Sequence, residues 1–144
     1  MGSWLREGHL VAMTRRYRLL GLELTSSFPF ASHLLEAEGD ADLCFEAEPA
    51  RPDGVASPEP VYESPFLDGL DRPVLRIERE DGFERLRFPG VADFLVREGR
   101  ISYTPFAPDR RDLVEVRFLG TVLAYYLERA GVPVLHASAV AVEG

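Results

Sequence analysis

The strongest constraint on the fold is a long segment at residues 110–131 that mixes apolar and charged side chains and ends in glycine. Its apolar residues recur at intervals of three and four, which predicts one helix whose apolar face consists of Val116, Leu119, Gly120, Leu123 and Leu127. Asp109 or Asp112 can cap the start of this helix, because a short carboxylate accepts hydrogen bonds from free backbone N–H groups. Gly131 suits a left-handed C-cap, and Pro133 prevents the helix from continuing.

The last segment, residues 132–144, is almost entirely apolar. His136 and Ser138 are its main polar side chains before the chain reaches Glu143-Gly144. A run of this kind is typical of a strand that is covered on both faces, as in the middle of an α/β sheet. We therefore predict a buried strand after the helix.

Short alternating segments separated by turn signals occupy much of residues 15–108. They predict strands at residues 17–24, 41–48, 74–79, 83–88, 91–96 and 101–104. Asp81-Gly82 and Glu98-Gly99 are hairpin turn signals, so the last four segments form an antiparallel meander. Strands followed by a helix predict an α+β fold, in which the long helix packs on one side of an antiparallel sheet.

These patterns divide the chain into three parts. Residues 1–14 are a poorly patterned extension, residues 15–108 form a β-rich N-terminal domain, and residues 109–144 form the helix and the final strand. Within the domain, residues 48–65 contain five prolines. We expect a mobile loop without regular structure there, because proline removes a backbone donor and restricts the preceding residue.

Composition excludes several classes of function. The chain carries 16 basic residues, all of them arginine, and a net charge of −8. This charge argues against general binding of phosphate backbones, so we expect no nucleic-acid partner. The absence of lysine excludes a Schiff-base lysine and the lysine of a phosphate-binding loop. One cysteine and the lack of a membrane-length apolar run predict a reduced, cytoplasmic protein that does not enter a membrane.

Among residue types that carry chemistry, His136 is the main candidate. His9 and His33 lie in weakly patterned segments, and we interpret them as surface residues. Cys44 has no His or Cys neighbour at the spacing of zinc ligands, so no metal site is predicted. His136 interrupts an apolar strand, where a hydrogen-bonded core histidine is commoner than a catalytic one. Periodicity alone leaves both interpretations open.

The segment around His136 also resembles a known family. Residues 135–144 read Leu-His-Ala-Ser-Ala-Val-Ala-Val-Glu-Gly, which resembles the segment immediately before the phosphate-binding loop in HPr kinase/phosphorylase-related proteins. Two upstream motifs agree with the family: Tyr-x-Leu-x-Gly-Leu at residues 17–22 and Pro-Gly-Val-Ala-x-Phe at residues 89–94. The resemblance therefore covers most of the chain and identifies it as the N-terminal part of such a protein.

This resemblance implies a P-loop kinase with a fold like that of phosphoenolpyruvate carboxykinase. Such a kinase phosphorylates a serine of a protein or peptide, using ATP and Mg²⁺. His136 takes the position of a histidine that is counted among the active-site residues of the true HPr kinases, so its catalytic role rests on motif position alone. Ala137-Ser138 replace the Gly-Val of those kinases. Some relatives in peptide-antibiotic clusters modify a precursor peptide.

The sequence departs from the family by ending before its GKS/T loop, so the loop lysine and the downstream carboxylates are absent. We therefore expect a truncated or split N-terminal portion of an HPr-kinase-like serine kinase, with no cofactor held by this chain and no phosphotransfer on its own. Expected partners are the phosphoacceptor protein or peptide, a separate kinase half, or a second copy, because the final strand would otherwise leave apolar surface and backbone groups unpaired. Two alternatives stay open: a stand-alone peptide- or protein-binding module in a regulatory or peptide-tailoring system, and a small enzyme with other chemistry.

Overall fold

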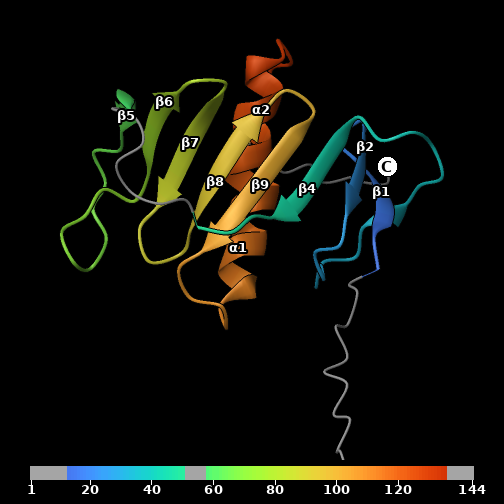
Figure 1. Ribbon diagram of the computed structural model, residues 1–144, viewed down its shortest axis with the longest axis horizontal. Coiled ribbons are helices and arrows are strands. Elements are labelled where there is room, and N and C mark those ends of the chain that lie inside the picture. Colours follow the sequence, from blue (N-terminus) through green and yellow to red (C-terminus); the bar gives the residue numbers. More distant parts are fainter. Residues whose placement is uncertain (1–12, 51–57, 136–144) are drawn as a thin grey trace, which may run out of the picture.

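A computed structural model describes residues 13–50 and 58–135 of the chain. Within these residues the fold is α+β, as the sequence predicted: a mixed, mostly antiparallel sheet of nine strands carries a 19-residue helical segment. The strand order is β3-β1-β2-β4-β9-β8-β7-β6-β5. The helical segment lies behind the middle of the sheet in Figure 1, so the sheet extends beyond it on both sides.

The elements follow one another in a simple order. The first five strands are β1 (Arg15–Leu19), β2 (Leu22–Ser26), β3 (Leu35–Glu36), β4 (Leu43–Ala47) and β5 (Glu59–Glu63). The next four are β6 (Arg76–Glu80), β7 (Phe83–Phe88), β8 (Ala92–Arg97) and β9 (Arg100–Pro105). The helical segment consists of α1 (Arg111–Arg117), the π-helical turn η1 (Phe118–Val122) and α2 (Leu123–Arg129).

The predicted meander is confirmed as β6 to β9, in which each strand pairs antiparallel with the next. Gly82 and Gly99 occupy the predicted turns with φ angles of +82° and +72°, a conformation that favours glycine. The strand predicted at residues 41–48 is confirmed as β4. However, β4 pairs in parallel with both β2 and β9, so the sheet is mixed rather than wholly antiparallel.

Two predictions about the N-terminal half are wrong. Residues 17–24 do not form one strand, because Leu20 and Gly21 both adopt positive φ angles, of +53° and +79°, and turn the chain into the β1–β2 hairpin. The proline-rich stretch is also not wholly irregular, since β5 lies inside it. Pro60 is tolerated there because β5 is the last strand of the sheet and the β5–β6 register shifts between Pro60 and Tyr62.

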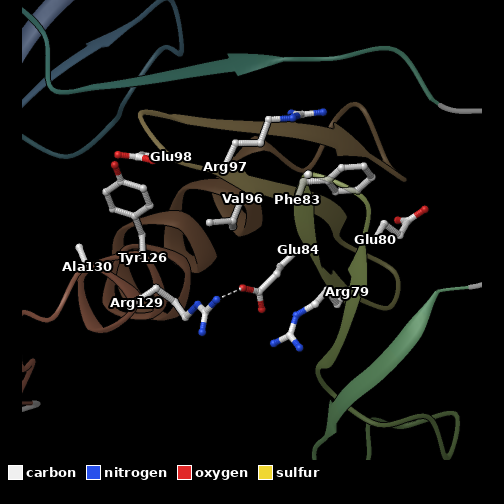
Figure 2. Close-up of a pocket in the computed structure, with 11 residues that line it drawn as sticks. Arg79, Glu80, Phe83, Glu84, Val96, Arg97, Glu98, Tyr126, Arg129 and Ala130 are labelled. Carbon is white, nitrogen blue, oxygen red and sulfur yellow. Dashed lines mark ion pairs between the residues drawn. The ribbon is translucent and has the colours of Figure 1, made fainter.

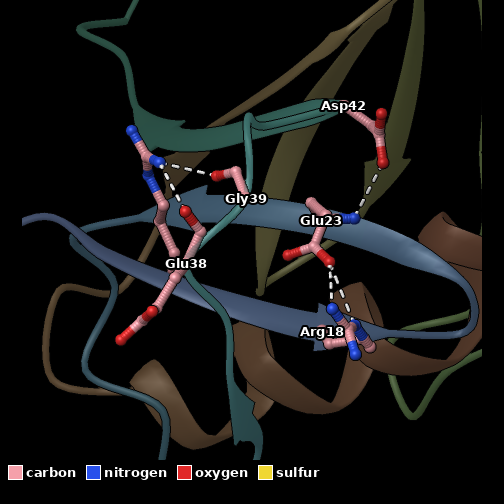
Figure 3. Close-up of polar contacts among 6 residues, drawn as sticks. Arg18, Glu23, Glu38, Gly39 and Asp42 are labelled. Atoms are coloured by element: carbon pink, nitrogen blue, oxygen red, sulfur yellow. Dashed lines mark hydrogen bonds and ion pairs between the residues drawn. The ribbon is translucent and has the colours of Figure 1, made fainter.

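Arg16 and Asp42 link the chain between β3 and β4 to the β1–β2 hairpin, and Arg18 forms an ion pair within the hairpin (Figure 3). Arg16 donates to the carbonyl oxygen of Gly39 at 2.6 Å. Arg18 donates to the Glu23 carboxylate at 2.8 Å, and the N–H of Glu23 donates to Asp42 Oδ2 at 2.9 Å. These side chains therefore have structural roles in addition to their exposure to solvent.

The hydrophobic core lies between the helical segment and the middle strands. Phe118 stacks on Phe45 with ring centroids 3.7 Å apart and planes 5° from parallel, and both side chains are fully buried. Val114, Val122 and Leu123 are buried with them. Because Phe45 comes from β4 and its neighbour Ile101 from β9, this packing joins the N-terminal strands to the meander.

The predicted apolar face of the helix is partly wrong. Leu123 and Leu127 are buried, but Val116 is 63% exposed, and the sheet is instead contacted by Val114, Phe118 and Val122. The helix has apolar residues on more than one side, so the periodic pattern did not identify a single face. The π-helical turn at Phe118–Val122 also changes the rotation between α1 and α2.

The two ends of the helical segment differ from each other in how well they were predicted. Arg110 is the N-cap residue, and no side chain accepts a hydrogen bond from the free N–H groups of the first turn, so the predicted Asp109 or Asp112 cap is wrong. The Asp112 carboxylate instead accepts from the Arg110 guanidinium at 3.2 Å. The C-cap at Gly131 is confirmed, with a φ angle of +84°. The N–H of Gly131 donates to the Glu128 carbonyl and that of Val132 to the Leu127 carbonyl, which is the Schellman arrangement.

Several predictions fall outside the described residues. His136 and the rest of residues 136–144, which carry most of the predicted final strand, lie there, as do residues 1–12 and 51–57. Residues 132–135, which are described, form no strand, and Leu135 is 88% exposed. No helix in the described part of the chain has the length and apolar character needed to cross a bilayer.

Candidate functional site

An open depression of about 690 Å³ lies where the end of α2 meets the β6–β7 hairpin and the β8–β9 turn (Figure 2). Its lining comes from elements that are distant in sequence, and it is formed by Arg79, Glu80, Gly82, Phe83, Glu84, Val96, Arg97, Glu98, Tyr126, Arg129 and Ala130. We call this the helix-end pocket. Val96 and Phe83 supply apolar surface, while charged side chains surround them.

Glu84 is the central polar residue of this pocket. It lies on β7 with only 9% of its surface exposed, on the face that also carries Leu86 and Phe88. Its carboxylate accepts a hydrogen bond from the Tyr125 hydroxyl and forms an ion pair with Arg129 Nη2 at 2.9 Å. A largely buried carboxylate requires such partners, because an unpaired charge in this position would be costly.

The environment of Glu84 changes the acidity of Tyr125. Burial is the main cause, and the hydrogen bond to Glu84 and its negative charge act in the same direction, raising the pKa of Tyr125 from 10.0 to about 12. The Arg129 and Arg79 guanidinium groups act against this shift. Tyr125 is therefore a protonated donor at neutral pH, and it has no tendency to act as a general base.

The other side of the pocket is held by contacts between turns and side chains. The Tyr126 hydroxyl accepts a hydrogen bond from the N–H of Gly99 at 3.1 Å, which fixes the β8–β9 turn to α2. The Arg97 guanidinium lies 5.0 Å from the centre of the Phe83 ring and 3.6 Å from the Glu48 carboxylate. These interactions give the pocket a fixed shape.

The charges of the helix-end pocket balance. Arg79, Arg97 and Arg129 face Glu80, Glu84 and Glu98 in the same lining. Arg129 pairs with Glu84, Arg97 with Glu48, and Arg79 lies 4.0 Å from Glu59. A triphosphate site needs an excess of donors directed at the phosphates, whereas this lining offers acceptors and donors in similar number. Such a surface suits polar groups of both kinds, as in a polypeptide.

The main residue predicted from sequence, His136, lies outside the described residues, as does His9. His33 is exposed, as predicted. Within residues 13–50 and 58–135, no group of three or more His, Cys, Asp or Glu side chains could hold a metal ion. Sequence reasoning missed Glu84, although a signal existed: it alternates with Leu86 and Phe88 and so occupies an apolar position of β7.

Comparisons with protein-family models, with curated proteins and with solved structures gave no match. The resemblance to HPr-kinase-related proteins therefore rests on the motifs quoted above. The assignments that depend on it, including the catalytic role of His136 and the use of ATP and Mg²⁺, stay predictions.

Proposed function

We propose that this chain is the polypeptide-recognising N-terminal portion of an HPr-kinase-like serine kinase, whose phosphate-binding loop lies outside these 144 residues. The observation that carries the proposal is the helix-end pocket, which has balanced charge and lies at the end of α2. In the sequence, His136, the residue that the family motif assigns to the kinase active site, follows the last residue of α2 by seven positions. In this proposal the pocket holds part of the phosphoacceptor.

The chemistry of the pocket supports recognition of a polypeptide rather than nucleotide binding. Each of its arginines already has an acidic neighbour, so a triphosphate would have to compete with existing ion pairs. Glu80 and Glu98 would also repel it. A polypeptide brings both donors and acceptors, which matches the mixed charges of the lining.

In this proposal the reaction requires two parts. The segment with the phosphate-binding loop holds ATP and Mg²⁺, and the γ-phosphoryl group passes to the serine oxygen as its bond to the β-phosphate oxygen breaks, leaving ADP and a released proton. The present chain contributes His136 and the surface that orients the phosphoacceptor. ATP and Mg²⁺ are implied by the resemblance to the family.

A second candidate function is a stand-alone peptide- or protein-binding module. One observation favours it: several large apolar side chains are exposed together around β5, on a part of the sheet that the helix does not cover. Exposed apolar clusters of this kind mark interaction surfaces. Both functions involve a polypeptide partner, and they differ in whether a kinase segment takes part.

The DNA that follows codon 144 distinguishes the two functions. We expect a reading frame that begins with a Gly-rich GKS/T loop, whose product co-purifies with the tagged chain. The mixture should transfer labelled phosphate from ATP to serine, whereas neither part should do so alone. The His136→Ala variant should retain association and lose transfer. A downstream region without such a loop, or phosphate transfer by the 144-residue chain alone, would contradict the proposal.

A further inference from the structure

One charged side chain of the helix-end pocket, Glu98 at the β8–β9 turn, has no partner. The other charged side chains of the lining all form ion pairs, which are Arg129–Glu84 at 2.9 Å, Arg97–Glu48 at 3.6 Å, Arg79–Glu59 at 4.0 Å and Glu80–Arg85 at 2.8 Å. Glu98 is exposed, and within residues 13–50 and 58–135 no hydrogen bond or ion pair reaches its carboxylate. The unmet charge of the pocket is therefore negative.

The Tyr126 side chain lies next to Glu98. Its hydroxyl accepts a hydrogen bond from the N–H of Gly99 at 3.1 Å, and Gly99 directly follows Glu98. Figure 2 shows the Glu98 and Tyr126 side chains on the same side of the pocket, with Arg79 and Glu80 on the other side. An aromatic ring attracts a cation to its face, and a carboxylate beside the ring supplies the opposite charge. The two side chains thus offer a cation two kinds of contact.

The end of the helix favours the same sign of charge. Arg129 and Ala130 of the lining lie at the C-terminal end of the 19-residue helical segment. The aligned peptide dipoles of a helix place a partial negative charge at this end, which stabilises cations near the last turn. Arg129 is itself such a cation, but its guanidinium is directed to the Glu84 carboxylate (Figure 2). The dipole and Glu98 therefore act together on a group that enters the pocket.

We propose that Glu98 and Tyr126 form a subsite that binds a basic side chain of the polypeptide partner, with arginine preferred over lysine. A guanidinium group can donate two parallel hydrogen bonds to the Glu98 carboxylate and can also stack on the Tyr126 ring, whereas an ammonium group cannot stack. An acidic side chain would have to displace Glu84 from Arg129, and Glu98 would repel it. The subsite rests on the proposed function only in taking the ligand of the pocket to be a polypeptide.

The test titrates the ¹⁵N-labelled 144-residue chain with capped tripeptides of alanine in which the middle residue is arginine, its neutral analogue citrulline, or glutamate. We expect saturable shifts of the Glu98 and Gly99 amide signals with the arginine peptide only. Glu98→Gln should weaken this binding by about fivefold, because the ion pair is lost while the shape of the side chain is kept. Glu128→Gln is the matched control and should bind normally, since Glu128 is an exposed residue of α2 outside the lining.

Three results would overturn this inference. They are the lack of a saturable shift with the arginine peptide, equal shifts with the citrulline or glutamate peptide, and unchanged binding by Glu98→Gln. Because Glu98 is exposed and unpaired among the described residues, Glu98→Gln should fold normally, and its circular dichroism spectrum and unfolding midpoint establish this.

The outcome of the peptide titration is independent of the kinase part of the proposed function. Selective binding of the arginine peptide by a chain whose gene has no downstream kinase frame would support the subsite and contradict the kinase. A downstream kinase frame together with no selectivity for arginine would do the reverse. The two proposals can therefore fail separately.

Discussion

At the scale of single residues, two buried carboxylates link the helical segment to distant parts of the chain. Glu84 on β7 holds Tyr125 and Arg129 of α2, while Glu115 of α1 accepts from the N–H groups of Ala31 and Ser32. Neither helix propensity nor the net charge of the chain indicates that these two carboxylates are buried and link distant segments. Each carboxylate is buried only because several donors reach it at once.

Replacing Tyr125 with Phe should destabilise the fold by about 0.5–1.5 kcal/mol, because Glu84 loses one hydrogen-bond donor in a largely buried position. Urea unfolding followed by circular dichroism measures the change. Tyr62→Phe is the matched control, since Tyr62 is 48% exposed, and its effect should be close to zero. Equal effects of the two substitutions would mean that the Glu84 contact contributes nothing.

The same residue predicts a dependence on alkaline pH. Because the pKa of Tyr125 is raised in the folded state, to about 12 from 10.0, its contribution to stability is fully present below pH 10 and is lost as the pH rises through 12. The free energy of unfolding should therefore fall less steeply above pH 10 in Tyr125→Phe than in the wild type. Identical slopes for the two proteins would contradict this account.

Asp68 predicts a change at acid pH in the loop after β5. Burial opposes ionisation of its carboxylate, but hydrogen bonds from the N–H groups of Leu70 and Arg72 and the charge of Arg72 lower its pKa below 3.8. Its contribution to stability is therefore present above pH 3.8 and is lost as the pH falls through the lower pKa of the folded loop. Asp68→Asn should increase hydrogen exchange at Leu70 and Arg72 at neutral pH, as acid does in the wild type. Asp71→Asn is the control and should leave both amides protected.

At the scale of elements, the sequence predicted the strands and turns whose pairing partners are close in the chain. The meander β6–β9 followed from alternation and from Gly82 and Gly99, which the turns require. The β1–β2 hairpin was missed because its turn is formed by Leu20-Gly21, where Leu carries no turn signal. The parallel pairing of β4 with β9 joins residues far apart in sequence, so no local pattern could indicate it.

Two glycines of the helical segment should respond in opposite directions to alanine. Gly131→Ala should cost about 1–2 kcal/mol, because Gly131 has a φ angle of +84° that a Cβ atom disfavours. Gly120→Ala should stabilise by up to about 1 kcal/mol, since nothing outside the neighbouring helix backbone lies within 4 Å of an added Cβ and alanine favours helix. Unfolding midpoints measure both, and the same sign for the two variants would contradict the assigned backbone geometry.

At the scale of the whole molecule, the sheet is wider than the helix that covers it, and this difference creates the surfaces discussed above. The helix-end pocket lies at the end of α2. The exposed apolar residues Val61 and Tyr62 belong to β5, on a part of the sheet that the helix does not cover. The sequence predicted the fold class, but it could not locate either surface. Both depend on which strand becomes the edge and on which helix face contacts the sheet, and long-range pairing decides these.

The most direct test of the central claim, that this chain recognises a polypeptide and needs another segment for nucleotide, is a calorimetric titration of the purified 144-residue protein with Mg-ATP. With three arginines of the helix-end pocket already paired and no lysine in the chain, we expect no saturable heat up to about 1 mM ATP, the upper end of ordinary substrate affinities. Saturable binding in the micromolar range that is lost on replacing Arg129 with Ala would contradict the account.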